Sequence, residues 1–310
     1  MRKAAIDVGS NSVLLLVAER SDAGWRPVYE DTAVTALGEG TKTTGLLGDA
    51  GMQRTLDALR RFYQKAQELG ATEVVAGATM AARIAQNTNN FISSAQAQGT
   101  PFIVLSGETE AEWGFRSVVE DPLFSELERL SVIDPGGHST EIVVAHRASA
   151  GWNVSFRKSY PIGTLGLRNT HFPNERLSSG EIFAGMAFID GQIDIHPDLA
   201  AGSTAVVLGA SGTNLISIRD RLLTWDPGKV HGKRLSFEEI SRAFGTLATM
   251  SDNERAQVQG MEAGREKTIH LGALILERSL HALRLEEVVV SVRGWRYAAL
   301  DVQPGDLKGL

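Results

Sequence analysis

Two short segments of the chain combine an aspartate with small turn residues, a pattern that suits the binding of phosphate. The first segment is Asp7-Val8-Gly9-Ser10-Asn11-Ser12, and the second is Asp134-Pro135-Gly136-Gly137-His138-Ser139. Successive backbone N–H groups in such a turn can surround phosphate oxygens, because glycine carries no side chain to hold the ligand away. The aspartates add carboxylates of the kind that a divalent cation needs. A single turn would be interpreted as a hairpin, but the related pair predicts a phosphate site.

Three other places carry groups that phosphate chemistry could use. Arg83 lies in a stretch with few other charges, and its planar guanidinium could hold a phosphate or simply face solvent from a helix. Glu108 and Glu110 follow a Ser-Gly pair, an order that is also typical of a helix N-terminus. Gly212 and Thr213 follow an apolar run, where a strand-to-helix turn could bind an anion or serve only as a connection.

The two aspartate turns belong to a repeat within the chain. At an offset of 127 residues, Ile6–Trp25 lies over Ile133–Trp152, and ten of the twenty positions are identical. An aspartate, an arginine and a tryptophan are among the identities, and the general likeness of strands and turns does not explain them. We interpret the repeat as a duplicated domain whose second copy starts near residue 128.

The residues around these turns predict the elements that position them. In each copy a short apolar strand ends at the aspartate and a second strand runs back, which is the order of an antiparallel hairpin. Apolar residues at spacings of three and four predict a helix over 52–69 that ends at Gly70. A strand near 74–76 and a helical stretch near 80–97 follow, and the second half also alternates strands with helices. Each half is therefore predicted to be a mixed sheet covered by helices, with the ligand in a cleft between the halves.

The composition excludes several classes of protein. With 43% apolar and 22% charged residues, the chain falls in the range of folded globular proteins. Its net charge of −6 gives no general attraction to nucleic acid or an anionic membrane, so local groups must hold an anionic ligand. No apolar run reaches the length of a membrane span, and polar residues interrupt the N-terminal apolar stretch too early for a signal peptide. The absence of cysteine excludes disulfides and a cysteine nucleophile, which leaves the cytoplasm as the expected location.

Six sequence blocks together resemble the Ppx/GppA family, the exopolyphosphatases and guanosine pentaphosphate phosphohydrolases of the actin/Hsp70/sugar-kinase superfamily. The blocks are, in order, Ile6–Ser12, Ala78–Asn87, Ser106–Ala111, Asp134–Glu141, Gly209–Thr213 and Ser291–Arg296. They span almost the whole chain, and the length is similar to that of the short members without a helical C-terminal extension. The resemblance is therefore specific.

The resemblance implies an α/β fold of two duplicated actin-like (ribonuclease H-like) domains, each a mixed sheet with helices. The ligand cleft would lie between the domains. Residues 1–125 would form the N-terminal domain and residues 126–310 the C-terminal domain. A C-terminal helix at about 295–310 would pack back on the first domain.

The resemblance also implies a role for each candidate residue. A glutamate at the position of Glu110 acts as the general base for the attacking water, and an arginine at the position of Arg83 holds a phosphate. The carboxylates at Asp134 and Glu141 lie near Mg²⁺ and the water, and Asp7 is a further expected ligand of Mg²⁺. Backbone and hydroxyl groups cradle the phosphates, and the residues that carry them are Gly9, Ser10, Asn11, Ser12, Gly136, Gly137, His138, Ser139, Gly212 and Thr213.

The chain departs from the family pattern at several positions. His138 stands at the third glycine of the second turn, and Thr109 stands where an acidic residue is common. Val292 occupies a place where the family often has aspartate, and Glu266-Lys267 replaces a frequent Ala-Asp pair. These changes leave Glu110 and the first turn intact, but they put substrate choice and turnover in question.

The leading interpretation is an exopolyphosphatase-type hydrolase that releases terminal phosphate from inorganic polyphosphate. Water would attack in line with assistance from Mg²⁺, and no covalent intermediate is required. The alternatives are a guanosine pentaphosphate 5′-phosphohydrolase, a non-catalytic sensor of polyphosphate or an alarmone such as guanosine tetraphosphate, and an ATP-dependent kinase. The expected partners are these phosphate compounds, with neither nucleic acid nor a membrane, and a homodimer stays open.

Overall fold

The computed structural model describes residues 1–22 and 24–302, which form two compact units. Unit 1 comprises Met1–Ser117 and the residues from Trp295 onward, and unit 2 comprises Val118–Gly294. The chain therefore passes between the units twice. The sequence placed the first boundary between residues 125 and 126, a few residues beyond the first passage. Of the expected helix at about 295–310, the part from 303 lies outside the described residues.

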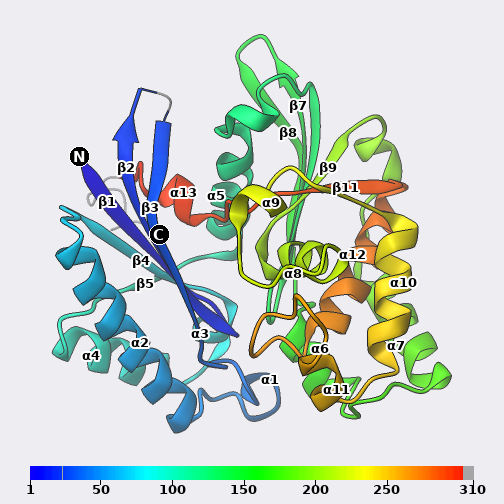
Figure 1. Cartoon of the computed structure of the whole chain (residues 1–310), viewed down its shortest axis with the longest axis horizontal. Helices are drawn as coiled ribbons and strands as arrows, with labels where there is room; N and C mark the ends of the chain where they lie inside the picture. The colour runs from blue at the N-terminus through cyan, green and yellow to red at the C-terminus, as the bar shows by residue number, and fades with distance from the viewer. Residues whose placement is uncertain (23, 303–310) are drawn as a thin grey trace. The chain divides into compact units, whose positions relative to one another are not determined.

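Unit 1 contains a five-stranded mixed sheet (Figure 1). Its strands, in spatial order, are β3 (Gly24–Val34), β2 (Ser12–Ser21), β1 (Arg2–Val8), β4 (Val74–Ala78) and β5 (Ile103–Val104). The first three are antiparallel neighbours, and β4 and β5 run parallel to β1. The helices of this unit are α1 (Thr41–Thr44), α2 (Asp49–Glu68), α3 (Met80–Ile84), α4 (Thr88–Ala97), α5 (Gly107–Val119, whose last two residues are in unit 2) and α13 (Arg296–Ala299).

Unit 2 repeats this sheet and adds one strand. Its order is β10 (Arg234–Ser236), β11 (Glu287–Val290), β9 (Thr204–Val207), β6 (Arg129–Pro135), β7 (Thr140–Ala148) and β8 (Gly151–Tyr160). Read from β8, the first five strands have the order and directions of the unit 1 sheet, and β10 is antiparallel at the far edge. The helices are α6 (Thr164–Thr170), α7 (Ser179–Gln192), α8 (Gly209–Arg219), α9 (Pro227–Val230), α10 (Phe237–Ala248), α11 (Asp252–Ala256) and α12 (Ile269–Leu283), with 3₁₀ turns η1 (Pro122–Phe124) and η2 (Pro197–Ala200).

The duplication extends to the distortions of the strands. A β-bulge interrupts the pairing of β2 with β3 between Val17 and Ala18. The same irregularity lies between Val144 and Ala145 in β7, at the offset of the sequence repeat. Because a bulge redirects every side chain beyond it, its recurrence at one offset confirms that the two halves are copies of one fold.

The repeated arginine and tryptophan contact each other across β2 and β3 in unit 1, and across β7 and β8 in unit 2. The Arg20 guanidinium lies 5.2 Å from the centre of the Trp25 ring, and that of Arg147 lies 4.9 Å from the Trp152 ring. These are distances at which a cation is attracted to an aromatic face. The identities in the sequence repeat therefore preserve a side-chain pair that joins the two strands next to the hairpin turn.

Both faces of the unit 1 sheet are covered. Alternate residues of β1 point to opposite faces, so that Ile6 packs with α2 and α4 in one cluster and Ala5 packs with Trp113 and Trp295 in another. Gly77 of β4 makes room for the second cluster, because a Cβ there would lie 2.9 Å from Cη2 of Trp295. The segment that returns from unit 2 thus completes the core of unit 1.

In unit 2, α12 is the central helix. Nearly all of its residues are buried, and its apolar side chains belong to the core cluster of this unit. Among the described residues, none of the helices is long and apolar enough to cross a bilayer.

Candidate functional site

The first predicted phosphate turn joins β1 to β2. Gly9 is required there, because a Cβ would lie 2.8 Å from the carbonyl oxygen of Ser12, to which the Gly9 N–H donates at 3.0 Å. The hydroxyl of Ser10 accepts a hydrogen bond from the N–H of Ala81 at 3.2 Å. Ala81 lies in α3, the helix that carries Arg83. The turn and Arg83 are therefore parts of one hydrogen-bonded framework.

Arg83 and Glu110 form an ion pair within unit 1. Nη1 of Arg83 lies 3.3 Å from Oε2 of Glu110 and donates to the carbonyl of Leu105 at 2.5 Å. Only 23% of the Arg83 side chain and 11% of the Glu110 side chain are exposed, so the arginine does not simply face solvent. Ser106 caps α5 by accepting from the N–H of Thr109, which leaves Glu110 to face the arginine. The cap interpretation thus explains Ser106 but not Glu110.

The second predicted phosphate turn joins β6 to β7 and contacts the start of α6. Gly136 donates to Ser139 O at 2.8 Å, the counterpart of the bond in the first turn. The N–H groups of Thr164 and Leu165 donate to the carbonyls of Gly136 and Gly137. His138, which stands at the third glycine, is fully buried, so its ring does not extend into solvent.

Two carboxylates face the same side of the unit 2 sheet. Asp134 and Glu141 are directly opposite each other in the pairing of β6 with β7, so their side chains project from one face. Burial raises the pKa of Asp134 to about 6, and the Ser159 hydroxyl donates to Glu141 at 2.6 Å. Like charges in this position repel each other unless a proton or a cation lies between them.

The donor set of unit 2 fits a magnesium ion with few protein ligands. Magnesium prefers carboxylate oxygens and keeps several waters or substrate oxygens, and Asp134 and Glu141 supply the carboxylates. In residues 1–22 and 24–302, no cluster of three or more His, Cys, Asp or Glu side chains could hold a metal by itself. Asp7, the third predicted ligand, is the last residue but one of β1 in unit 1 and matches Asp134 in the repeat.

The start of α8 approaches the Asp134 carboxylate. Gly209 has φ +74, and a Cβ on it would lie 2.9 Å from Oδ1 of Asp134. Gly212 lies against β9, where a Cβ would come within 2.5 Å of Val207. Close packing of helix on strand therefore accounts for Gly212. The hydroxyl of Thr213 bonds weakly back to carbonyls of its own helix, at 3.4 Å.

The structure adds a basic residue to which the sequence gave no role. Arg265 lies in a loop that packs on α8 through Gly260, whose carbonyl accepts from Asn214 at 2.7 Å. Only 13% of its side chain is exposed, and its Nε lies 3.4 Å from Glu262. The sequence gives no sign that this arginine is buried, because its burial depends on how the loop folds onto α8.

The sequence model of the Ppx/GppA phosphatase family matches residues 16–301. The chain belongs to this family. Among curated relatives, it is 28% identical to a guanosine-5′-triphosphate,3′-diphosphate pyrophosphatase of Aeromonas salmonicida over 93% of this chain and 56% of that protein. It is 27% identical to exopolyphosphatase 2 of Mycobacterium tuberculosis over 91% of each chain. The chain thus spans a little over half of the first relative and nearly all of the second.

Solved structures of Ppx/GppA proteins have the same fold. The crystal structure of the Aquifex aeolicus family member matches with a TM-score of 0.77 and 29% identity, over 97% of this chain and 96% of that one. The prediction of an α/β protein built from two mixed, actin-like sheets is confirmed.

The predicted site residues of this Ppx/GppA chain fall into two groups. Those of unit 1 are Asp7, Gly9, Ser10, Asn11, Ser12, Arg83 and Glu110. Those of unit 2 are Asp134, Gly136, Gly137, His138, Ser139, Glu141, Gly212 and Thr213. In unit 1, a hydrogen bond joins Ser10 of the first turn to α3, the helix that carries Arg83. In unit 2, Asp134 and Glu141 lie on the two strands that the second turn joins. That one ligand contacts both groups stays a prediction.

Proposed function

We propose that the chain is a hydrolase that releases terminal phosphate from inorganic polyphosphate, with water as the nucleophile. The observation that carries this proposal is the Arg83–Glu110 pair, mostly buried at 3.3 Å on a framework shared with a phosphate turn. Membership of the Ppx/GppA phosphatase family and the match in length to exopolyphosphatase 2 of M. tuberculosis support it. The absence of cysteine fits the cytoplasm as its proposed location.

In this proposal Glu110 and Arg83 have complementary roles. The carboxylate of Glu110 accepts a proton from water as water attacks the terminal phosphorus, and the leaving group is the shortened polyphosphate. Arg83 places positive charge beside the transferred phosphate, where its fork can hold two oxygens. The contact with Arg83 at 3.3 Å also fixes the position of the Glu110 carboxylate.

The two turns and the unit 2 carboxylates would hold the substrate. Backbone N–H groups of the turns bind phosphate oxygens, and Asp134 and Glu141, with Asp7 from unit 1, would hold Mg²⁺ together with water and substrate oxygens. When bound, the ion supplies charge neutralisation at the phosphates. Local donors are needed because the net charge of −6 repels a polyanion.

Guanosine pentaphosphate is the second candidate substrate. The name of the A. salmonicida relative supports it, although this chain covers only 56% of that protein. A non-catalytic sensor is the third candidate, because His138 alters the second turn. Retention of the Arg83–Glu110 pair favours hydrolysis over sensing.

Isotope incorporation tests the proposed reaction directly. Hydrolysis of polyphosphate in ¹⁸O-labelled water should put one labelled oxygen into each released orthophosphate. Transfer of the phosphate to another acceptor, or no release at all, would contradict the proposal.

A further inference from the structure

Arg255 is the most buried cation among the described residues, with 0% of its side chain exposed. Its guanidinium donates to four backbone carbonyls, which belong to Glu266 at 2.5 Å, Glu175 at 3.0 Å, Leu247 at 2.8 Å and Met250 at 2.7 Å. These carbonyls belong to the loop after α6, to the C-terminal end of α10 and the residues that follow it, and to the loop before α12. One side chain therefore holds together the segments that follow α6, follow α10 and precede α12.

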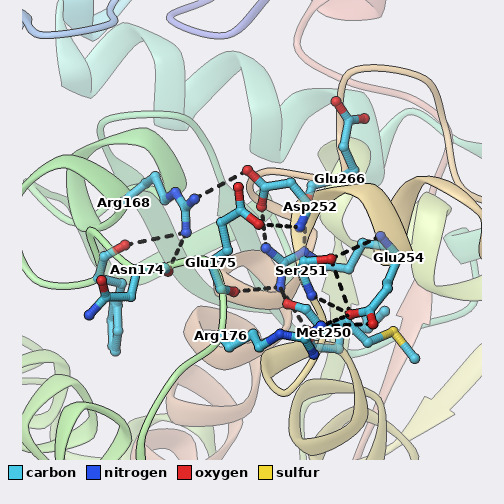
Figure 2. A network of polar contacts seen from close by, with 12 residues as sticks. Arg168, Asn174, Glu175, Arg176, Met250, Ser251, Asp252, Glu254 and Glu266 are labelled. Atoms are coloured by element: carbon cyan, nitrogen blue, oxygen red, sulfur yellow. Dashed lines mark hydrogen bonds and ion pairs between the residues drawn. The ribbon is translucent and has the colours of Figure 1, made fainter.

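Asp252 connects this arginine to a second one. Its Oδ1 accepts from Arg255, and its Oδ2 accepts from Nη2 of Arg168 at 3.2 Å. Figure 2 shows Arg168 pointing toward Asp252. Nη1 of the same guanidinium donates to the carbonyl of Asn174 at 2.5 Å. Each oxygen of the carboxylate thus serves a different arginine.

The two ends of this Arg168–Asp252–Arg255 relay lie next to the phosphate segments of unit 2. Arg168 is in α6, and Leu165 at the start of that helix donates to the carbonyl of Gly137 at 2.8 Å. At the other end, Glu266 lies three residues before the start of α12, and Gly272 in the first turn of that helix lies against Ser211 of α8. The relay therefore joins the support of the 136–139 turn to the support of the 209–213 turn.

We propose that Arg255, acting through Asp252 and Arg168, is a positioning residue that sets the spacing of these two phosphate segments. It touches no ligand itself. Its effect is on how well the turns fit successive phosphates, so loss of the relay weakens substrate binding rather than the chemical step. The identity of the ligand in this inference rests on the proposed function.

The test uses Asp252→Asn rather than a change of Arg255, whose carbonyl contacts hold three loops in place. An asparagine keeps one carbonyl oxygen as an acceptor, but an NH₂ donor replaces the other carboxylate oxygen. This NH₂ group cannot accept from the guanidinium that it faces. The relay is then broken while the contacts of Arg255 to the loops remain. Arg176→Gln is the matched control, because Arg176 joins the same loops through Thr249 and Glu254 but lies outside the relay.

For Asp252→Asn we expect KM for inorganic polyphosphate to rise about tenfold with kcat within about twofold, since misplaced binding groups act on substrate binding. Arg176→Gln should leave both constants within about twofold at a comparable loss of thermal stability. Arg168→Gln should resemble Asp252→Asn, and the double variant should be no worse than either single change. A fall in kcat with unchanged KM would show only a loss of folded protein, and would overturn the proposal.

Amide hydrogen exchange gives a readout that does not depend on hydrolysis. In Asp252→Asn, residues 136–139 and 209–213 should exchange faster than in wild type, and in Arg176→Gln they should not. Equal exchange in the two variants would also overturn the proposal. If wild type hydrolyses no phosphate compound, the proposed function fails, while the exchange comparison still decides the positioning role.

Discussion

Arg83 and Glu110 form a mostly buried ion pair, to which the proposed function gives the roles of phosphate ligand and general base. The sequence left two interpretations open for each residue, solvent exposure for Arg83 and helix capping for Glu110. A one-dimensional pattern cannot separate them, because the capping residue and the acid lie within one helical turn. The structure gives capping to Ser106 and leaves Glu110 to face the arginine, a contact across 27 residues.

Replacement of Arg83 tests its role at the phosphate. Arg83→Lys keeps the charge but loses the planar fork, so we expect kcat/KM to fall by about 10- to 100-fold, and Arg83→Met to fall further. Steady-state phosphate release measures both. Arg61→Gln, on an exposed arginine of α2, should remain near wild type. Wild-type kinetics in Arg83→Met would remove Arg83 from the site.

The Asp134 carboxylate yields a prediction about metal. Because burial raises its pKa to about 6, the folded state favours the protonated acid, and the stability from this group is lost as pH rises through about 6. At pH 8 without metal, Asp134→Asn should therefore be more stable than wild type by about 1–3 kcal/mol. Added Mg²⁺ should raise the melting temperature of wild type but not of the variant. An equal response of both proteins to Mg²⁺ would contradict a role for Asp134 in holding the ion.

At the scale of elements, the sequence repeat predicted the hairpin of each half, because strand and turn patterns are local. The helix predicted over 52–69 is α2, with Gly70 in the left-handed conformation just beyond it. The stretch near 80–97 is helical as predicted, but the structure divides it into two helices, α3 and α4. The backbone N–H of Gln86 donates to the carbonyl of Gly45, and Asn87 bonds the backbone of Leu47 through its side chain. These contacts with residues 45–47 interrupt the helix, and the local sequence pattern does not predict them.

The buried His270 at the start of α12 predicts a pH-dependent stability of unit 2. Burial, and then the charges of Arg255 and Arg168, lower the pKa of this imidazole to about 2. An unfolded histidine binds its proton near pH 6.5, so the unfolded state takes up more protons below that pH. Stability is then constant above about pH 6.5 and decreases below it, by up to about 1.4 kcal/mol per pH unit.

Urea unfolding at pH 7.5 and pH 5.5 measures this effect. The wild-type protein should lose about 1 kcal/mol more than His270→Val between the two values, because valine carries no titrating group. Comparing the change in unfolding free energy between the two pH values in the two proteins removes the contribution that the other titrating groups make to both. An equal loss of unfolding free energy in the two proteins would show that His270 does not control the pH dependence.

At the scale of the whole molecule, the chain enters unit 2 after Ser117 and returns at Trp295. The sequence suggested that the C-terminal segment packs back on the first half, but not where. That position depends on the absence of a side chain at Gly77, which admits the Trp295 ring, and such complementarity is not visible in either segment alone.

The predicted binding of one ligand by both units has a consequence that scattering can measure. If polyphosphate contacts both groups of residues, binding should reduce the radius of gyration, because two units joined by chain crossings can move as hinged bodies. Small-angle scattering of Glu110→Gln with and without polyphosphate avoids turnover during the measurement. Identical profiles at saturating ligand would argue for a rigid arrangement.

The most direct test of the account compares phosphate release by wild type and Glu110→Gln from polyphosphate, guanosine pentaphosphate and ATP, with and without Mg²⁺. We predict Mg²⁺-dependent release that is fastest from polyphosphate. We also predict that Glu110→Gln lowers kcat by about 10²- to 10⁴-fold while polyphosphate binding is retained. Turnover near wild type in that variant, or no release from any of the three compounds by the wild-type protein, would contradict the account.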